Sequence, residues 1–230
     1  MQTDAVTKER AWRTHEELPL NRENFEALCR FDLPCLRITG FAKDSECDEL
    51  VAAMDAVGLH KTYKVPGLKK PPRYVGLTQF EKRQASKDDY FAEVDQAWHE
   101  HEAVISKMPW NPFERMWKLI RELYPECTLT LAEEPGYGRY YAGIIRDTTG
   151  GGTLHADVTI YSARDYIISQ VVNQITWNFF ATHVDGDGGK TTLHNRPYRV
   201  ETKPGDKVEI EGFNRSYVDG AETHIYAPAK

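Results

Sequence analysis

The sequence predicts an α+β protein in which helices come first and a β-rich part follows. Two observations lead to this prediction. Up to about residue 125, apolar side chains recur at helical spacing, and after Pro125 the chain becomes short β-like runs separated by glycine. Turn-forming stretches such as DTTGGG and DGDGG divide these runs at the spacing of an antiparallel sandwich or barrel. We therefore expect residues 1–125 to form a mainly helical region and residues 126–230 the β-rich core of the same domain.

The first region contains recognisable starts and stops of helices. Asp44 or Ser45 can cap one helix and Gly58 ends it, while Pro112 suits the first turn of another that stops before Pro125. Residues 61–80 are rich in Pro, Gly and Lys and are expected to form a long loop. The expected helices are 24–30, 44–57, 87–107 and 111–124, and the expected opening strand is 34–41. The later strands are expected at 128–132, 138–145, 153–160, 170–182, 190–194, 207–210 and 224–227.

Composition excludes several classes of protein. Of the 230 residues, 11% are aromatic and 40% hydrophobic, which argues against a disordered chain. The net charge of −6 gives no dominant basic footprint for duplex nucleic acid, and the basic stretch 61–73 is expected to be a solvated loop. No apolar run reaches the roughly 18 residues that cross a bilayer, and the charged first residues lack the apolar core of a secretory signal. We expect a cytoplasmic protein that binds neither membrane nor nucleic acid.

The cysteines fit that expectation. Cys29, Cys35, Cys47 and Cys127 form no CxxC pair, and none has a His at zinc-ligand spacing. Four reduced thiols are the simplest interpretation in a reducing compartment. Cys29 and Cys35 flank an apolar segment and are expected to be small buried side chains.

The strongest chemical signal is the stretch GGGTLHADV at residues 150–158. His155 and Asp157 are two positions apart on an expected strand, so both side chains point to the same face. An imidazole nitrogen and a carboxylate oxygen then converge on one point, which suits a divalent first-row metal. Two His and one carboxylate on one face form the ligand set of non-haem Fe(II) oxygenases, but a histidine beside an acid is also common without a metal.

Two longer stretches resemble a known family. The lead-in ITGFAKDSECDELVAAM resembles the opening strand and helix of Fe(II)/2-oxoglutarate dioxygenases. The stretch from Arg139 to Arg199 resembles the core of that superfamily and is most similar to the branch of radical halogenases and hydroxylases that act on free amino acids. The HxD motif, the WNFF strand and the turn around GGKTTLHNRP match together. The resemblance implies that the helices pack on a double-stranded β-helix, or jelly roll.

The resemblance also implies a reaction. Halogenases of this branch carry Gly or Ala where the HxD motif has its carboxylate, which opens a chloride site on the iron. This chain keeps Asp157, so the resemblance implies hydroxylation of an unactivated C–H bond by radical rebound. The implied cofactors are Fe(II) and 2-oxoglutarate, which supply the oxidative chemistry together with O₂. The implied substrate is a free amino acid or a similar small polar molecule.

The third iron ligand has two interpretations. His224 lies on a later expected strand and can be the second histidine of the triad. Alternatively, its segment GAETHIYAPAK resembles the strand before the one that carries that histidine, and the ligand then lies beyond residue 230 in a longer form of the chain. His183 and His194 are weaker candidates because each adjoins a polar turn.

The remaining site residues follow from the chemistry of the ligands. The distal carboxylate of 2-oxoglutarate needs a cation, for which Arg146 is the first candidate and Arg196 a weaker one. Asn178 and Tyr140 lie on expected core strands and can contact the cofactor. For an amino-acid substrate, Arg73 can bind the carboxylate, and Glu134 or its neighbour Glu133 can face the ammonium group.

Two other classes of function fit the same pattern. A cupin-like or jelly-roll module can bind a small molecule, or serve in an assembly, without catalysis. A zinc or manganese lyase on a β-barrel would use the same ligands for another reaction. Consumption of 2-oxoglutarate and O₂ only in the presence of Fe(II) separates the oxygenase from both.

Overall fold

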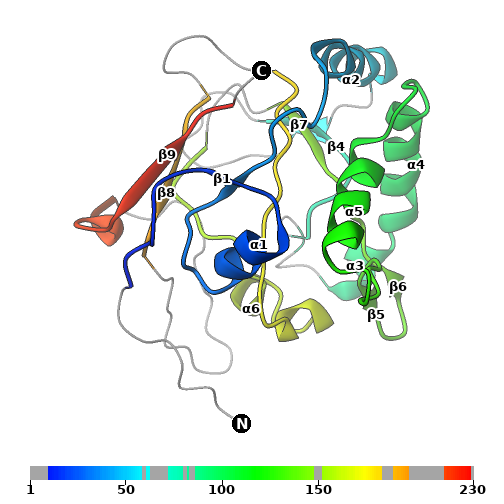
Figure 1. Ribbon diagram of the computed structural model, residues 1–230. Coiled ribbons are helices and arrows are strands. Elements are labelled where there is room, and N and C mark those ends of the chain that lie inside the picture. Colours follow the sequence, from blue (N-terminus) through cyan, green and yellow to red (C-terminus); the bar gives the residue numbers. More distant parts are fainter. Residues whose placement is uncertain are drawn as a thin grey trace. The chain divides into compact units, whose positions relative to one another are not determined.

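The computed structural model describes residues 10–58, 61–62, 72–79, 82, 86–147, 152–182, 189–196 and 215–228 (Figure 1). The chain divides into two compact units. The described residues of Met1–Phe41, His183–Gly205 and Asn214–Lys230 form the first unit, and those of Ala42–Thr182 form the second. The structure is thus a mixture of helices and short strands, as predicted for an α+β protein.

The first unit combines one helix with two small sheets. Asn21 caps the helix by accepting a hydrogen bond from the backbone N–H of Asn24, as expected for a short polar side chain at this position. The elements are β1 (Leu18–Pro19), α1 (Arg22–Cys29), β2 (Leu36–Arg37), β8 (Thr191–His194), the 3-10 helix η3 (Arg215–Val218) and β9 (Thr223–Tyr226). Strands β1 and β2 are parallel, whereas β8 and β9 are antiparallel with Leu193 opposite His224. The predicted helix 24–30 and the predicted strands 190–194 and 224–227 are confirmed within two residues.

Glu222 connects the start of this unit to the turn before β9. Its carboxylate accepts a hydrogen bond from the backbone N–H of Trp12 at 2.9 Å and from the side chain of Asn195 at 2.8 Å. The imidazole of His15 lies 2.8 Å from the other oxygen of Glu222. These contacts hold residues 12–15 beside the strands that come last in the chain.

The helices of the second unit are α2 (Asp44–Val57), α3 (Lys87–Phe91), α4 (Val94–Ile105), α5 (Pro112–Leu123), α6 (Thr159–Ser162) and the 3-10 helix η2 (Ile167–Gln170). Lys43 rather than Asp44 is the N-cap of α2, and Gly58 ends that helix with φ +66°, a conformation that glycine adopts without steric cost. Asn111 caps α5, with Pro112 at its start as predicted. The single helix expected over 87–107 is wrong, since α3 and α4 are separate helices.

The strands of the second unit differ from the predicted ones: two of them lie within residues 61–80, where a long loop was expected, and no strand covers 128–132. Antiparallel β3 (Lys61–Thr62), β4 (Arg73–Val75) and β7 (Ile145–Asp147) form one sheet, and β5 (Glu133–Glu134) pairs with β6 (Gly138–Arg139) in another. The expected strand 153–160 is wrong, since residues 152–158 contain only an isolated bridge at His155 and α6 begins at Thr159. No closed barrel occurs among the described residues, so the jelly roll stays a prediction.

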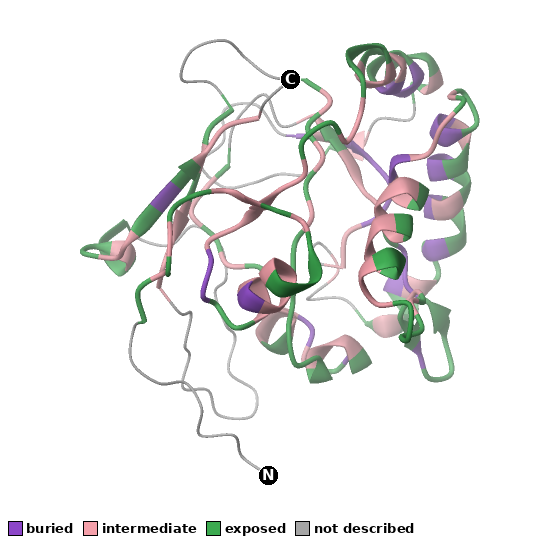
Figure 2. Cartoon of the chain, in the orientation of Figure 1, coloured by how far each residue is buried: buried purple, intermediate pink, exposed green. Residues whose placement is uncertain are grey.

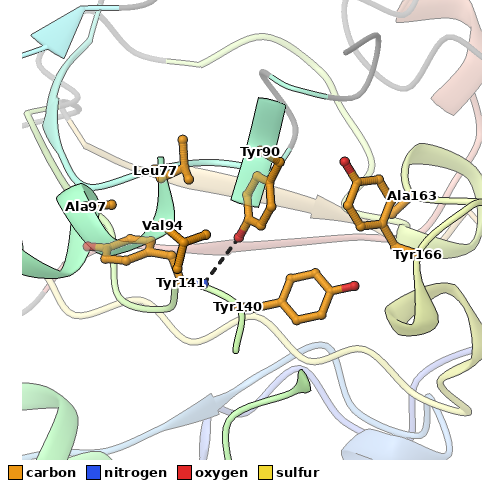
Figure 3. Packing of buried hydrophobic residues seen from close by; sticks show 8 residues of the cluster. All are labelled: Leu77, Tyr90, Val94, Ala97, Tyr140, Tyr141, Ala163 and Tyr166. Atoms are coloured by element: carbon orange, nitrogen blue, oxygen red, sulfur yellow. Dashed lines mark hydrogen bonds between the residues drawn. The ribbon is translucent and has the colours of Figure 1, made fainter. Parts of the chain in front are cut away.

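The core of the second unit is rich in tyrosine. Ala97, Val94 and Leu77 pack there against four tyrosines, and Figure 3 shows the hydroxyl of Tyr90 directed at the backbone nitrogen of Tyr141, which donates to it at 3.3 Å. Tyr90 is 1% exposed, and burial raises its pKa to about 12, so the buried hydroxyl stays neutral. The members of this tyrosine cluster are Leu77, Tyr90, Val94, Ala97, Tyr140, Tyr141, Ala163 and Tyr166.

A second cluster joins α2 to α4. Leu50, Ala53 and Met54 of α2 pack against Val75 and Val104, and both valines are completely buried. In Figure 2 the buried positions of α4 lie along one side of the helix, as its helical apolar spacing requires. None of the described helices combines the length and the apolar character that a membrane crossing needs.

Candidate functional site

His155 lies on an exposed, irregular segment that leads into α6. Its Nδ1 atom is 2.7 Å from the carbonyl oxygen of Thr153. A carbonyl oxygen can only accept a hydrogen bond, so Nδ1 carries a hydrogen and Nε2 is the ring nitrogen left for a metal. Metal-binding histidines are held in the same way, with the second ring nitrogen donating to a carbonyl or carboxylate. The local backbone therefore fixes His155 in a tautomer that can bind a metal.

Asp157 is also exposed, and a neighbouring segment orients its carboxylate. The hydroxyl of Thr176 donates to Oδ2 of Asp157 at 3.4 Å. Two residues further on, the backbone N–H of Thr159 donates to Oε1 of Gln174 at 2.8 Å. Residue 157 thus contacts residue 176, and residue 159 contacts residue 174. Because one number rises while the other falls, the two segments run antiparallel. This segment supplies a hydrogen-bonding partner for the carboxylate, a feature that also accompanies metal-binding carboxylates.

The partner segment alternates in burial. Trp177 packs edge-on against Phe113 at 5.8 Å between ring centroids, and Phe179 packs against Trp110 at 5.9 Å. Thr176 and Asn178, the two residues that flank Trp177 in the sequence, are exposed. Because alternate side chains of an extended chain share a face, Asn178 lies on the same face as the Thr176 hydroxyl that contacts Asp157. The expected strand 170–182 is wrong as a strand, since residue 170 ends η2 and none of residues 171–182 belongs to a described strand.

The other two predicted cofactor residues have different surroundings. Arg146 is exposed on β7, where it stands opposite Tyr74 in the register of the sheet. Tyr140 is buried in the tyrosine cluster, and its hydroxyl donates to the carboxylate of Glu134. Burial and that carboxylate raise the pKa of Tyr140, which keeps the phenol protonated.

The predicted substrate residues are both engaged in ion pairs within the protein. Arg73 on β4 donates from two guanidinium nitrogens to Oδ2 of Asp147, at 3.1 and 2.9 Å, across the strand pair. Glu134 is 4% exposed and accepts from the ammonium of Lys87, the hydroxyl of Tyr140 and the backbone N–H of Ile167. Its neighbour Glu133 is exposed.

The remaining histidine candidates lie elsewhere in the chain. His224 belongs to β9 of the first unit, is 7% exposed, and places Nε2 at 3.3 Å from Oε1 of Glu17. His194 lies on β8, and Arg196 donates to the carbonyl oxygen of Asp219 at 2.8 Å. His183 lies outside the described residues.

One group of three ligand-bearing side chains was not foreseen from the sequence. Glu17, Cys35 and His224 place their ligand atoms within 4.8 Å of one another, and this is the only such group that the described residues form. The sequence contains no signal for it, because more than 180 positions separate Cys35 from His224. Only the pairing of the strands brings these residues together.

A pocket of about 480 Å³ was also not foreseen. Phe91, Trp98, Tyr137 and Arg139 are among the residues that line it. The rings of Phe91 and Tyr137 stack there at 4.9 Å between centroids. None of the predicted site residues lines this pocket.

His155 and Asp157 offer an imidazole and a carboxylate, ligand types that suit a divalent iron. The histidine is held in the binding tautomer, and the aspartate offers a carboxylate that is already oriented by a hydroxyl. A facial triad needs one more ligand, and the described residues of the second unit place no third His, Cys or carboxylate with this pair. The described part of the chain therefore supplies two ligands of such a site.

The chain shares sequence similarity with a protein from a fungal biosynthesis cluster. No protein-family model and no solved structure matches the chain. The leucinostatins biosynthesis cluster protein S of Purpureocillium lilacinum is 30% identical over 158 residues, which make up 67% of this chain and 63% of that relative. The chain thus spans less than two thirds of the relative's length. It is similar to a protein named for a biosynthesis cluster.

Proposed function

We propose that this protein is a tailoring enzyme of a biosynthetic pathway, an Fe(II)/2-oxoglutarate-dependent hydroxylase that acts on a free amino acid or a similar small polar molecule. The observation that carries the proposal is that His155, whose Nδ1–H donates to the Thr153 carbonyl, precedes by two positions Asp157, whose carboxylate accepts from Thr176. The relative from a biosynthesis cluster supports the biosynthetic role.

The face around Asp157 supports a cofactor site. If the antiparallel register defined by the pairs 157–176 and 159–174 continues by two residues, His155 comes opposite Asn178. The two proposed ligands and the Asn178 amide then share one exposed face. Of the three predicted cofactor residues, Asn178 is thus best placed, whereas the hydroxyl of Tyr140 is engaged by Glu134. Arg146 is exposed on β7 and stays the proposed cation for the distal carboxylate.

The protein's own part in this proposal is binding and orientation. His155 Nε2 and the Asp157 carboxylate would hold the iron, while Thr153 and Thr176 fix their orientation. Bound iron and 2-oxoglutarate would supply O₂ activation and oxidation of the C–H bond. The Asp157 carboxylate would fill the position that chloride takes in the related halogenases, which favours hydroxylation.

The test uses the full chain under anaerobic conditions. Addition of Fe(II) and then 2-oxoglutarate should produce the visible charge-transfer absorption of the iron–2-oxoglutarate chelate. Admission of O₂ with a library of free amino acids should produce succinate in step with one hydroxylated product. His155→Ala and Asp157→Ala should lose the absorption, whereas His99→Ala, which removes an exposed histidine of α4, should keep it. Absence of the absorption in the parent protein, or its persistence in His155→Ala, would contradict the proposal.

A non-catalytic binding module is the second candidate, favoured by the aromatic pocket beside Phe91 and Trp98, which none of the proposed ligands lines. A binding module would take up a small molecule there in the absence of Fe(II) and would form no succinate. Binding that disappears in Trp98→Ala but is unchanged in His155→Ala would select this candidate.

A further inference from the structure

The pairing of β1 with β2 brings an acid and a thiol together. The two strands are parallel, and Leu18 stands opposite Leu36. Glu17 and Cys35 each precede these residues by one position, so the register continues to place them side by side. Arg37, two positions after Cys35, is on the same face and donates from Nε to the Glu17 carboxylate.

The third member of the group comes from the other sheet of the first unit. His224 lies on β9, buried, with Nε2 at 3.3 Å from Oε1 of Glu17. The nitrogen, the thiol sulfur and the carboxylate oxygen all lie within 4.8 Å of one another. Ligands of a tetrahedral zinc ion are separated by about 3.5 Å, as its bond lengths of about 2.0–2.3 Å require. Small side-chain rotations would thus bring all three atoms into range of one ion.

From this geometry we propose that Glu17, Cys35 and His224 bind a zinc ion, with a fourth position for water or another small ligand. The ion would bridge the segments before β1 and β2 to β9, so it would tie the first unit together. The site lies apart in sequence from the His155–Asp157 pair, and it does not rest on the proposed function.

The surroundings of the three residues suit a bound cation. Arg37 holds one oxygen of Glu17, Oε2, and the other oxygen, Oε1, faces His224. The guanidinium is itself anchored, since it donates to the carbonyl oxygen of Ala227 at 2.9 Å. A hydrogen bond from Arg37 lowers the pKa of the Glu17 carboxyl against the effect of burial, so this ligand is ionised at neutral pH.

Zinc binding requires the Cys35 thiol to lose its proton. Burial, with a smaller contribution from the Glu17 charge, raises the pKa of Cys35 to about 11 in the absence of metal. When zinc binds, the S–H bond breaks, the Zn–S bond forms and the proton goes to solvent, with no change of oxidation state. Glu17 and His224 could instead form only an ion pair, which would not involve the Cys35 thiol. A change of Cys35 therefore distinguishes a zinc site from an ion pair.

Cobalt(II) provides the direct test because a bound thiolate gives a sulfur-to-cobalt charge-transfer band. The parent chain should bind one Co²⁺ with this band, and added Zn²⁺ should remove it. Cys35→Ser should lose the band, and His224→Gln should lower the affinity at least about a hundredfold, which is the upper range for loss of an outer-shell partner. Cys127→Ser, which changes an exposed free cysteine, is the matched control and should keep the band.

A second measurement needs no variant and is insensitive to any folding defect of the variants. Zinc should slow the reaction of one of the four thiols of the parent chain with an alkylating reagent, and peptide mapping should identify that thiol as Cys35. Equal protection of all four thiols, no protection, or a cobalt band that persists in Cys35→Ser would overturn the proposal. His155→Ala should lose the iron–2-oxoglutarate absorption and keep the cobalt band. Failure of the zinc proposal can therefore be distinguished from failure of the proposed function.

Discussion

Lys87, at the start of α3, forms an ion pair with Glu134 of β5, whose side chain is only 4% exposed. The same carboxylate accepts hydrogen bonds from Tyr140 and from the backbone of Ile167. One buried acid therefore connects α3, the β5–β6 hairpin, the tyrosine cluster and η2. A buried carboxylate with three donors is satisfied, but removal of its charge would leave those donors without a partner.

We predict that Glu134→Ala lowers the free energy of unfolding by about 3 kcal/mol, because it leaves a partly buried ammonium and a phenol unpaired. Glu133→Ala, which changes the exposed neighbour, should change it by less than about 0.5 kcal/mol. Urea denaturation followed by circular dichroism measures both. Equal effects of the two substitutions would show that the Lys87 contact contributes nothing specific.

The same acid gives a pH dependence. Burial alone would raise the pKa of Glu134, but the hydrogen bonds from Lys87 and Tyr140 outweigh it and hold the pKa below its ordinary value near 4.5. Its contribution to stability is therefore complete above that value and is lost as the pH falls through the lower pKa of the folded protein. Glu134→Gln should show a shallower loss of stability below pH 4.5 than the parent protein.

Gly76 follows β4 with φ +111° and lies against a tyrosine ring. A Cβ atom there would come within 2.2 Å of the Tyr141 hydroxyl oxygen, and the buried ring cannot move aside without disturbing the cluster. We predict that Gly76→Ala costs more than about 3 kcal/mol of stability through overpacking and backbone strain. Gly58→Ala is the control, since its φ of +66° costs about 1 kcal/mol but nothing lies within 4 Å of its Cβ. Equal thermal midpoints of the two variants would contradict the account.

His101 is 5% exposed among Trp98, Phe113 and Tyr141, with Nδ1 at 3.2 Å from the Tyr141 hydroxyl. Burial lowers its pKa below the ordinary value near 6.5, so the folded protein holds it neutral where the unfolded chain takes up a proton. Stability should accordingly be complete above pH 6.5 and should fall as the pH drops below it. His101→Gln should flatten this dependence between pH 6.5 and 5, and the exposed His99→Gln should leave it unchanged.

The sequence predicted those helices best whose boundaries are encoded locally. Asn111 and Gly58 fix the ends of α5 and α2 through their own hydrogen bonds and dihedral angles, so the pattern and the structure agree. The break between α3 and α4 was missed because the apolar spacing from Tyr90 to Ile105 is continuous through both helices. The expected strand 170–182 was not found as a strand, because a run of β-forming residues does not specify a hydrogen-bonded partner strand.

The two candidate metal groups differ in whether a local sequence motif can reveal them. His155 and Asp157 are two positions apart, so the motif alone could suggest a shared ligand role, and their supporting partners Thr153 and Thr176 only became visible in three dimensions. Glu17 and Cys35 are matched by the strand register, and His224 reaches them through the fold of the first unit. Such contacts between distant positions depend on tertiary structure and leave no local pattern.

Thr176 tests whether the orientation of Asp157 matters. Thr176→Val keeps the shape of the side chain but removes the hydroxyl that donates to Oδ2, so Fe(II) affinity should fall about tenfold, as for other outer-shell partners. Thr176→Ser retains the hydroxyl and should restore most of the affinity. Anaerobic titration of the iron–2-oxoglutarate absorption measures all three proteins, and equal affinities for Val and Ser would show that the hydrogen bond has no part in metal binding.

Asp157 itself distinguishes hydroxylation from halogenation. Asp157→Gly removes the carboxylate that, in the proposed site, takes the position of chloride in the halogenases that the sequence resembles, so hydroxylation should fall to background. At high chloride concentration the same variant should form a chlorinated product, detectable by the isotope pattern of chlorine in mass spectra. Asp157→Glu is the matched control, since it keeps a carboxylate and should form no chlorinated product. If Asp157→Gly hydroxylates its substrate as fast as the parent, Asp157 is not an iron ligand, because loss of a metal ligand cannot leave the metal's reaction unchanged.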